Sequence, residues 1–138
     1  METPTYHQIE TFFVDYFNEF RSSCSDPGTL SRLNRYLDPD MQAEIRRLSR
    51  ISAPPDVFSC REQYMRFLQE AGQEFVEETT LKEVTVDERK QAVAVVMDIR
   101  RVETDTGAIH SLAGYGTYQL SLGPDQELKI RRISLFEC

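Results

Sequence analysis

The sequence predicts an α+β fold, in which helices pack on one face of a curved antiparallel sheet. Two observations favour this class. Apolar residues recur at helical spacing in the first half of the chain, whereas they alternate with polar residues in the second half. Helical patterns that precede a run of strands are typical of α+β domains. The 138 residues match the length of one domain, so we expect a single domain over residues 1–138.

Three helices are expected to come first, beginning with an aromatic-rich one over residues 5–23. Its apolar stripe consists of Tyr6, Ile9, Phe12, Phe13, Tyr16, Phe17 and Phe20. The second helix starts at Ser25-Asp26-Pro27, a cap followed by proline at the first helical position. It carries Leu30, Leu33, Tyr36 and Leu37 inward and stops at Asp38-Pro39-Asp40, because the residue before proline disfavours helix.

The third helix is expected after the loop at residues 53–56. Ser59 and Glu62 have the spacing of a capping box, in which each side chain bonds the other residue's backbone N–H. Tyr64, Phe67, Leu68, Ala71 and Phe75 then fall on one face of this helix. Before the loop, Met41, Ile45 and Leu48 suggest a further short helix.

Four strands are expected from residue 77 onward, over 77–86, 91–103, 108–122 and 128–136. Polar turns between consecutive strands impose antiparallel pairing. On the second strand, Val93, Val95, Met97 and Ile99 share one face, which we expect to be buried. Gly114 and Gly116 permit a bend in the third strand. Long strands coil, so the sheet should wrap the first helix as a cone with a cavity at its mouth. We expect a second copy of the chain to cover the other sheet face, as a homodimer.

Composition excludes several classes. The net charge of −7 argues against nucleic acid and anionic membranes as partners, since both require basic surface. No apolar run approaches the roughly 20 residues of a membrane span. The three widely spaced cysteines indicate free thiols in a reducing compartment, and we expect a cytoplasmic protein. Phosphate-binding loops and metal-ligand constellations are not recognisable, so neither a metal nor another cofactor is predicted.

Polar residues on the expected strands are candidates for acid–base chemistry. Asp98 lies mid-strand among apolar residues, where an acid is unfavourable unless it is exposed or paired; its alternatives are a cavity acid or an ion pair with Arg100. His110 begins the third strand with the parity of Tyr118. If that parity faces inward, His110 is a general acid or base, and otherwise it is a surface residue after a turn.

Other residues are candidates for binding a substrate. Tyr16 and Tyr118 are placed to donate hydrogen bonds to a carbonyl or enolate, the alternative being core packing. Arg131 and Arg132 are adjacent, so that one should enter the cone, and Ser134 shares a face with Arg132. The predicted substrate-binding set consists of Tyr118, Arg132, Ser134 and Arg100, with Phe13 and Met97 as apolar lining.

This order of elements resembles the NTF2-like fold, and within it the SnoaL-like small enzymes. The resemblance rests on the first helix with Tyr16, on Leu33-Asn-Arg-Tyr-Leu-Asp-Pro-Asp40, on His110-Ser-Leu-Ala-Gly-Tyr-Gly-Thr-Tyr118 and on Leu128-Lys-Ile-Arg-Arg-Ile-Ser-Leu-Phe-Glu137. The third stretch is similar to fungal SnoaL-like proteins. The fold hosts enzymes, transport adaptors and oligomerisation modules alike, so the resemblance bears mainly on architecture.

Two chemistries of the superfamily match in part. Resemblance to ketosteroid isomerases implies Tyr16 as a hydrogen-bond donor to the oxyanion. The position of their general base falls nearest Glu44 and Ile45, and the position of their second, acidic donor falls near Tyr115, which is not an acid. Resemblance to limonene epoxide hydrolases implies Asp98 and Arg100, but in reversed order and with Ser134 where a second Asp would fall. We therefore expect a cofactor-independent isomerase, cyclase, dehydratase or epoxide-opening enzyme acting on a hydrophobic polyketide- or terpenoid-derived molecule, with His110, Asp98 and Tyr16 as catalytic residues. The alternative is a non-catalytic ligand-binding or dimerisation module.

Overall fold

Six strands form one sheet in the order β2-β1-β6-β5-β4-β3. The computed structural model describes residues 4–20, 26–47 and 54–138. The strands are β1 (Leu37–Arg47), β2 (Asp56–Phe58), β3 (Phe75–Asp87), β4 (Ala92–Glu103), β5 (Ile109–Leu122) and β6 (Leu128–Glu137). The helices are α1 (Tyr6–Glu19), α2 (Pro27–Asn34) and α3 (Arg61–Glu74). The architecture is therefore α+β, as predicted.

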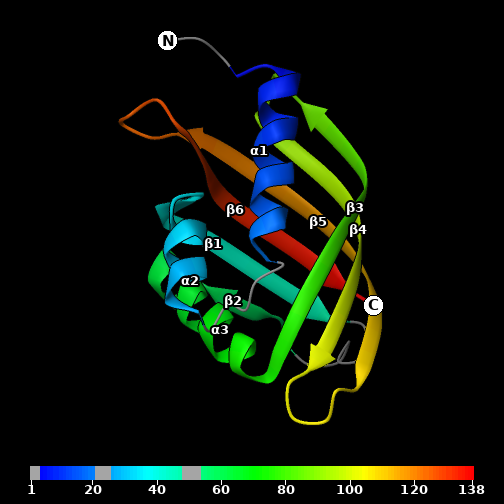
Figure 1. Ribbon diagram of the computed structural model, residues 1–138. Coiled ribbons are helices and arrows are strands. Elements are labelled where there is room, and N and C mark those ends of the chain that lie inside the picture. Colours follow the sequence, from blue (N-terminus) through cyan, green and yellow to red (C-terminus); the bar gives the residue numbers. More distant parts are fainter. Residues whose placement is uncertain (1–3, 21–25, 48–53) are drawn as a thin grey trace.

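The sheet curves around α1, while α2 and α3 lie together at one end of the cone (Figure 1). Helix α1 begins with a capping box, since the Thr5 hydroxyl accepts from the backbone N–H of Gln8 and the Gln8 side chain accepts from that of Thr5. Asp26 caps α2, and Pro27 occupies its first turn, as predicted. Among the described residues, no helix is long and apolar enough to cross a membrane.

The long strands confirm the predicted antiparallel meander and its buried face. Strands β3, β4, β5 and β6 pair antiparallel in sequence order. Val93, Val95, Met97 and Ile99 are all buried, on the concave face that receives α1. The period of two in this segment therefore predicted the buried face of the sheet correctly.

The predicted short helix at Met41, Ile45 and Leu48 is wrong, because residues 37–47 form strand β1. Met41 and Ile45 are four residues apart, a spacing that places two side chains on one face of either a helix or a strand. Burial of the intervening Ala43 marks the period of two that belongs to a strand. Leu48 lies outside the described residues. Pro39 sits within an irregularity of the β1–β6 register rather than at the end of a helix.

Strand β1 changes the predicted topology in two ways. It pairs parallel with β6 and antiparallel with β2, so the sheet is neither four-stranded nor wholly antiparallel. Both strands also precede α3, so the three helices do not all come before the sheet. The predicted capping box of α3 is wrong as well. Its N-cap is Cys60, and the backbone N–H of Ser59 instead donates to the side chain of Gln63, 2.8 Å away.

Aromatic side chains fill the closed end of the cone. Phe13 is fully buried, with its ring centroid 5.0 Å from that of Tyr118 on β5 and 6.3 Å from that of Tyr16. The ring centroid of Phe17 also lies close to that of Tyr118, at 6.0 Å. Gly116 makes room for this cluster, because a Cβ atom there would stand 2.8 Å from the Tyr118 ring. The glycine at position 116 is thus required by the packing of one buried ring.

We predict that Gly116→Ala destabilises the protein by about 1–3 kcal/mol, because the added methyl group displaces the packed Tyr118 ring. Chemical denaturation followed by circular dichroism measures this change. Ser111→Ala, at an exposed position of the same strand, is the matched control and should change the stability by less than about 0.5 kcal/mol. Equal stability of Gly116→Ala and the wild type would contradict this account of the cluster.

Candidate functional site

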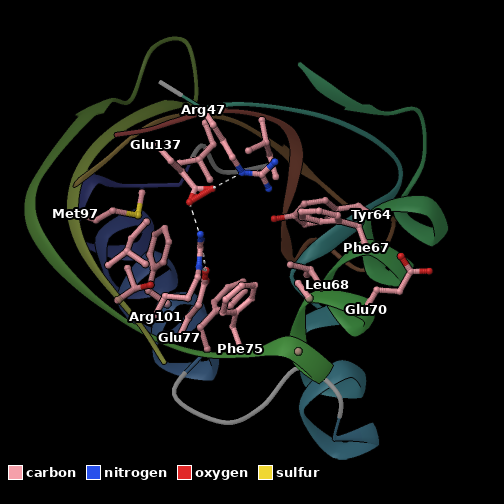
Figure 2. Close-up of a pocket in the computed structure, with 18 of the residues that line it drawn as sticks. Arg47, Tyr64, Phe67, Leu68, Glu70, Phe75, Glu77, Met97, Arg101 and Glu137 are labelled. Carbon is pink, nitrogen blue, oxygen red and sulfur yellow. Dashed lines mark hydrogen bonds and ion pairs between the residues drawn. The ribbon is translucent and has the colours of Figure 1, made fainter. Parts of the chain in front are cut away.

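A cavity of about 300 Å³ lies between α3, the end of α1 and the concave face of the sheet (Figure 2). Its apolar lining includes Phe20, Phe67, Leu68, Phe75, Met97 and Ile99. Its polar lining includes Arg47, Glu77, Arg101 and Glu137, together with the tyrosines Tyr16, Tyr64 and Tyr118. An apolar cavity with a few convergent polar groups is the usual form of a small-molecule site.

Two cross-strand pairs of opposite charge form the polar wall. Glu77 on β3 is the register partner of Arg101 on β4, and its carboxylate accepts a 2.6 Å hydrogen bond from Arg101 Nε. Arg47 at the end of β1 is the register partner of Glu137 at the end of β6, with Arg47 Nε 3.8 Å from Glu137 Oε1. Residues directly opposite on neighbouring strands interact, so the register itself places both pairs.

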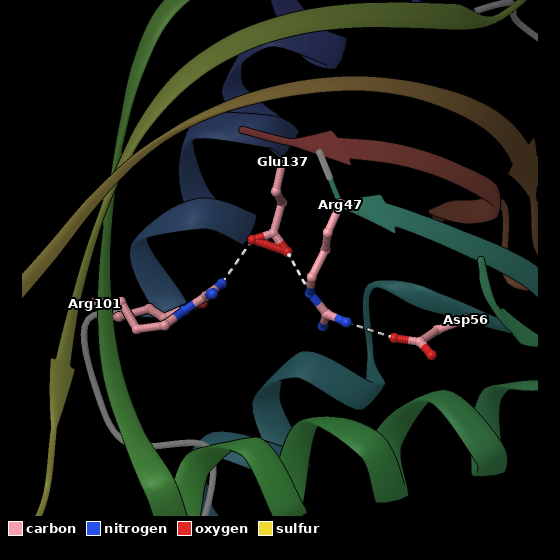
Figure 3. A network of polar contacts seen from close by, with 5 residues as sticks. Arg47, Asp56, Arg101 and Glu137 are labelled. Carbon is pink, nitrogen blue, oxygen red and sulfur yellow. Dashed lines mark hydrogen bonds and ion pairs between the residues drawn. The ribbon is translucent and has the colours of Figure 1, made fainter. Parts of the chain in front are cut away.

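The curvature of the sheet joins the two pairs into one network (Figure 3). Arg101 Nη2 donates a 2.7 Å hydrogen bond to Glu137 Oε2, although β5 separates their strands. Glu137 is only 5% exposed and Arg101 only 18%. Glu137 lines the cavity, and its Oε1 lies 3.8 Å from Nε of Arg47 on the opposite side. The carboxylate therefore keeps one oxygen toward the cavity.

Arg101 is the most strongly held member of the network. Burial lowers the pKa of its guanidinium, but the charges and hydrogen bonds of Glu77 and Glu137 outweigh this effect and raise it above the ordinary value. The guanidinium also lies over the Phe75 ring, 5.5 Å from its centroid. Arg101 thus stays charged and fixes the position of the Glu137 carboxylate.

Arg47 reaches the cavity from the opposite side and is held by a second acid. Its Nη1 donates a 2.7 Å hydrogen bond to Asp56 Oδ2, and Asp56 is the first residue of β2. A guanidinium carries five N–H groups in a fixed plane. Asp56 and Glu137 approach Arg47 at Nη1 and Nε, so these two acids engage fewer N–H groups than a guanidinium carries.

Tyr118 supplies a neutral hydroxyl to the same space. Burial raises its pKa well above the ordinary value, and the charges of Tyr64 and Glu137 add to this effect. The phenol therefore remains protonated across the physiological range and is available as a hydrogen-bond donor. Tyr64 points into the cavity from α3, opposite the charged network (Figure 2).

The cavity brings together three of the residues predicted from the sequence. Tyr16, Tyr118 and Met97 all line it. Phe13, predicted as apolar lining, is instead packed in the core against Tyr118. For Tyr16 and Tyr118 the sequence left two alternatives, packing in the core or donating a hydrogen bond to a substrate. Both side chains are buried, and both also line the cavity.

Four other predicted residues lie on the outer, convex face of the sheet. Asp98 is 60% exposed and 3.5 Å from Lys82, while Arg100 lies 3.8 Å from Glu78. Arg132 is exposed and bonds the side chain of Gln42, and Ser134 is exposed on the same strand. Their parity is opposite to that of the buried residues beside them, and the curvature of the sheet carries the outer face away from the cavity. Asp98 and Arg100 share the outer face, but each pairs with β3 instead of with the other.

His110 has the inward parity that was proposed for it but lies beyond the cavity. It is the second residue of β5 and half-exposed, with Nε2 3.3 Å from a carboxylate oxygen of Glu103. The pKa of Glu103 is lowered by a hydrogen bond from Thr106 and then by one from His110. His110 thus lies beside the β4–β5 turn. The parity of a residue predicts which face of the sheet its side chain occupies, but it does not predict how far along the strand the cavity extends.

The sequence analysis missed the charged network, although part of its signal was present. Arg101 continues the alternation that runs through Met97 and Ile99, so it shares the inward face. Arg47 was assigned to a short helix and therefore could not be paired with β6. Glu137 was noted only as part of the resemblance, because an acid near the end of a strand is usually exposed.

Neither a model of a protein family nor a curated protein matches the sequence. Solved structures do match. A predicted SnoaL-like polyketide cyclase from Jannaschia sp. CCS1 is 14% identical with a TM-score of 0.73, covering 99% of this chain and 90% of its own. AusH from Aspergillus nidulans is 13% identical with a TM-score of 0.71, covering 98% and 86%. An NTF2-like protein of unknown function from Exiguobacterium is 12% identical with a TM-score of 0.66, covering 92% and 98%. The chain therefore has the NTF2-like fold.

We predict that Arg101→Leu destabilises the protein by about 3–5 kcal/mol, because it leaves Glu137 buried without its hydrogen-bonded partner. Denaturant unfolding measures the change. Arg100→Leu, at the preceding residue, is the matched control, because the exposed 3.8 Å ion pair of Arg100 with Glu78 contributes about 1 kcal/mol or less. Similar effects of the two substitutions would show that the buried network does not stabilise the fold.

Proposed function

We propose that this protein is an acid–base enzyme that binds a neutral, apolar carbonyl compound in the cavity and moves a proton at the carbon next to the carbonyl group. The observation that carries the proposal is the Glu137 carboxylate, which turns Oε1 toward an apolar cavity while Arg101 holds Oε2. Isomerisation, cyclisation and dehydration all begin with such a proton transfer. We favour polyketide- or terpenoid-derived substrates, in keeping with the similarity to SnoaL-like proteins.

In the proposed reaction, Glu137 is the general base and a tyrosine hydroxyl receives the developing charge. Oε1 takes a proton from the carbon next to the carbonyl, and the electrons of that C–H bond pass to the carbonyl oxygen as an enolate. Tyr118, kept neutral by its raised pKa, donates a hydrogen bond to this oxygen. Arg47 offers a second donor. Returning the proton to a different carbon completes an isomerisation without any other reactant.

The alternative is a non-catalytic binding module of the same fold. One observation favours it: Glu137 contacts two guanidiniums, as does a carboxylate whose role is to pair buried charges within the fold. Such a module would bind the same ligands in the same cavity without transferring a proton. Binding and proton transfer therefore have to be measured separately.

We predict that the protein accelerates exchange of the C2 hydrogens of 1-tetralone in D₂O, and that Glu137→Gln lowers this rate at least 100-fold by removing the base. Proton NMR follows the loss of the C2 signal, and line broadening reports binding in the same samples. Asp98→Asn is the matched control, since it neutralises an acid on the outer face. Binding without acceleration would favour the binding module, and equal rates for Glu137→Gln and the wild type would contradict Glu137 as the base.

We also propose that two copies of the chain associate through the convex face of the sheet. Val96, Tyr115 and Phe136 are register neighbours on three adjacent strands and form an apolar row across this face, with Tyr115 48% exposed. The charges beside the row, such as Asp98 with Lys82, already pair within one chain. These charges are therefore neutralised within each copy before two such faces meet.

We predict a dimer mass for the wild type at about 50 μM by light scattering coupled to size exclusion, and a monomer mass for Tyr115→Lys, which places a charge in the centre of the apolar row. Ser111→Lys, near the start of β5, should remain dimeric. A monomeric wild type at this concentration would contradict the proposed interface.

A further inference from the structure

Helix α3 forms one wall of the cavity, and its first half is held in place by buried side chains. Tyr64 and Leu68 of this half are only 4% and 8% exposed. At the start of the helix, Arg61 Nη1 donates a 3.1 Å hydrogen bond to the backbone oxygen of Leu37 on β1. Packing and this hydrogen bond therefore fix the first half of α3 to the core and to the sheet.

The last turn of α3 buries much less side-chain surface. Gln73 and Glu74 are exposed, and Gly72 is buried but has no side chain to pack. Gly72 and Glu74 nevertheless line the cavity, and Phe75 begins β3 directly after the helix, without an intervening loop (Figure 1). A segment that buries little apolar surface opens locally at a low cost in free energy. The last turn is thus the part of this wall that opens most easily.

A single residue of another hairpin holds the last turn. Thr104 lies in the β4–β5 turn, and its hydroxyl donates to the backbone oxygens of Gln73 and Glu74, at 2.9 and 3.2 Å. The backbone N–H of Thr104 also donates to the oxygen of Glu74, at 2.9 Å. The last carbonyls of a helix have no partner within the helix, so Thr104 caps α3 from a position 30 residues away. Both hydroxyl bonds are exposed, and water replaces them when the turn unwinds.

The β4–β5 turn presents Thr104 in a defined position. The Glu103 carboxylate accepts a 2.6 Å hydrogen bond from the Thr106 hydroxyl and lies 3.3 Å from His110 Nε2. The N–H of Gly107 donates to the backbone oxygen of Glu103 at 3.0 Å, with Gly107 in the left-handed region at a φ of 73°. His110 therefore belongs to the structure that holds the end of α3.

We infer that the last turn of α3 is the gate of the cavity and that Thr104 is its latch. Ligands enter and leave when this turn unwinds, while Leu68 and Phe75 on either side of it stay in place. This inference rests on the proposed function, since it requires the cavity to be the ligand site. Thr104 lies outside the cavity lining, so its hydroxyl holds the gate equally with and without ligand. It therefore controls the rates of binding and release, and not the affinity.

The test compares Thr104→Val, which keeps the shape of the side chain but removes the hydroxyl, with Thr104→Ser, which keeps the hydroxyl. In Thr104→Val, hydrogen–deuterium exchange followed by NMR should be at least about 5-fold faster at the amides of residues 71–75 and unchanged at the buried amides of β4. Line shapes in a 1-tetralone titration should show association and dissociation rates that both rise at least about 5-fold, with the dissociation constant changed by less than about 2-fold.

The conservative variant and a matched control keep the wild-type rates. Thr104→Ser should match the wild type in both measurements, because its hydroxyl still caps the helix. Thr85→Val removes an exposed hydroxyl from β3 by the same substitution and should also match the wild type.

Unchanged hydrogen exchange of the last turn in Thr104→Val, or unchanged binding rates despite faster exchange, would overturn the inference. Equal effects of Thr104→Val and Thr104→Ser, or equally faster exchange throughout β4, would overturn it as well, because the hydroxyl would then not act on the gate. The 1-tetralone exchange assay on the same samples separates this failure from failure of the proposed function. Exchange at C2 that depends on Glu137, together with unchanged binding rates, would overturn the gate alone. Absence of 1-tetralone binding by every variant would overturn the gate and the proposed function together.

Discussion

The burial of one carboxylate at the end of β6 constrains the open half of the molecule. Glu137 is nearly removed from water, and a buried charge is tolerated only when it is paired and hydrogen bonded. Its partners come from β4 and β1, and each partner is held in turn by an acid of β3 or β2. The network thus connects both edge strands of the sheet, β2 and β3, to the central strand β6. It forms only if the sheet curves enough for the Arg101 side chain to reach Glu137 across β5.

The same curvature divides the cone into a filled end and an open end. At the filled end, Phe13 and Phe17 of α1 pack on Tyr118, and Gly116 gives this ring its space. At the open end, α3 covers the sheet without filling the space beneath it, and Tyr64 and Leu68 form the opposite wall of the cavity. Tyr118 belongs to both ends, so the position of its hydroxyl in the cavity depends on the aromatic packing behind it.

The sequence was sufficient to predict the meander and its buried face, because Val93, Val95, Met97 and Ile99 are large apolar residues at every second position between two polar turns, which indicates a strand. It was not sufficient to predict β1, because the four-residue spacing of Met41 and Ile45 fits both the helical period of 3.6 and the strand period of 2. In addition, the strand that β1 pairs with, β6, is some 90 positions away in the chain. Nor could it locate the site along the strands. His110 and Arg101 are register partners, yet Arg101 turns into the cavity whereas His110 ends at the turn. Parity determines the face, but the depth of a side chain depends on how far the sheet has curved at that level.

This distinction explains why the acids that attracted attention in the sequence differ from those that line the cavity. Asp98 is conspicuous because its neighbours are apolar, but the apolar residues on either side of it face inward, and it faces water beside Lys82. An exposed pair of this kind gains little, since water screens both charges. Arg101 and Glu137 contribute more because they are desolvated, and desolvation is a property of the folded sheet that is absent from local sequence. A charged residue that continues a buried alternation, as Arg101 does after Ile99, is therefore a better sequence indicator of a site than a charged residue that interrupts one.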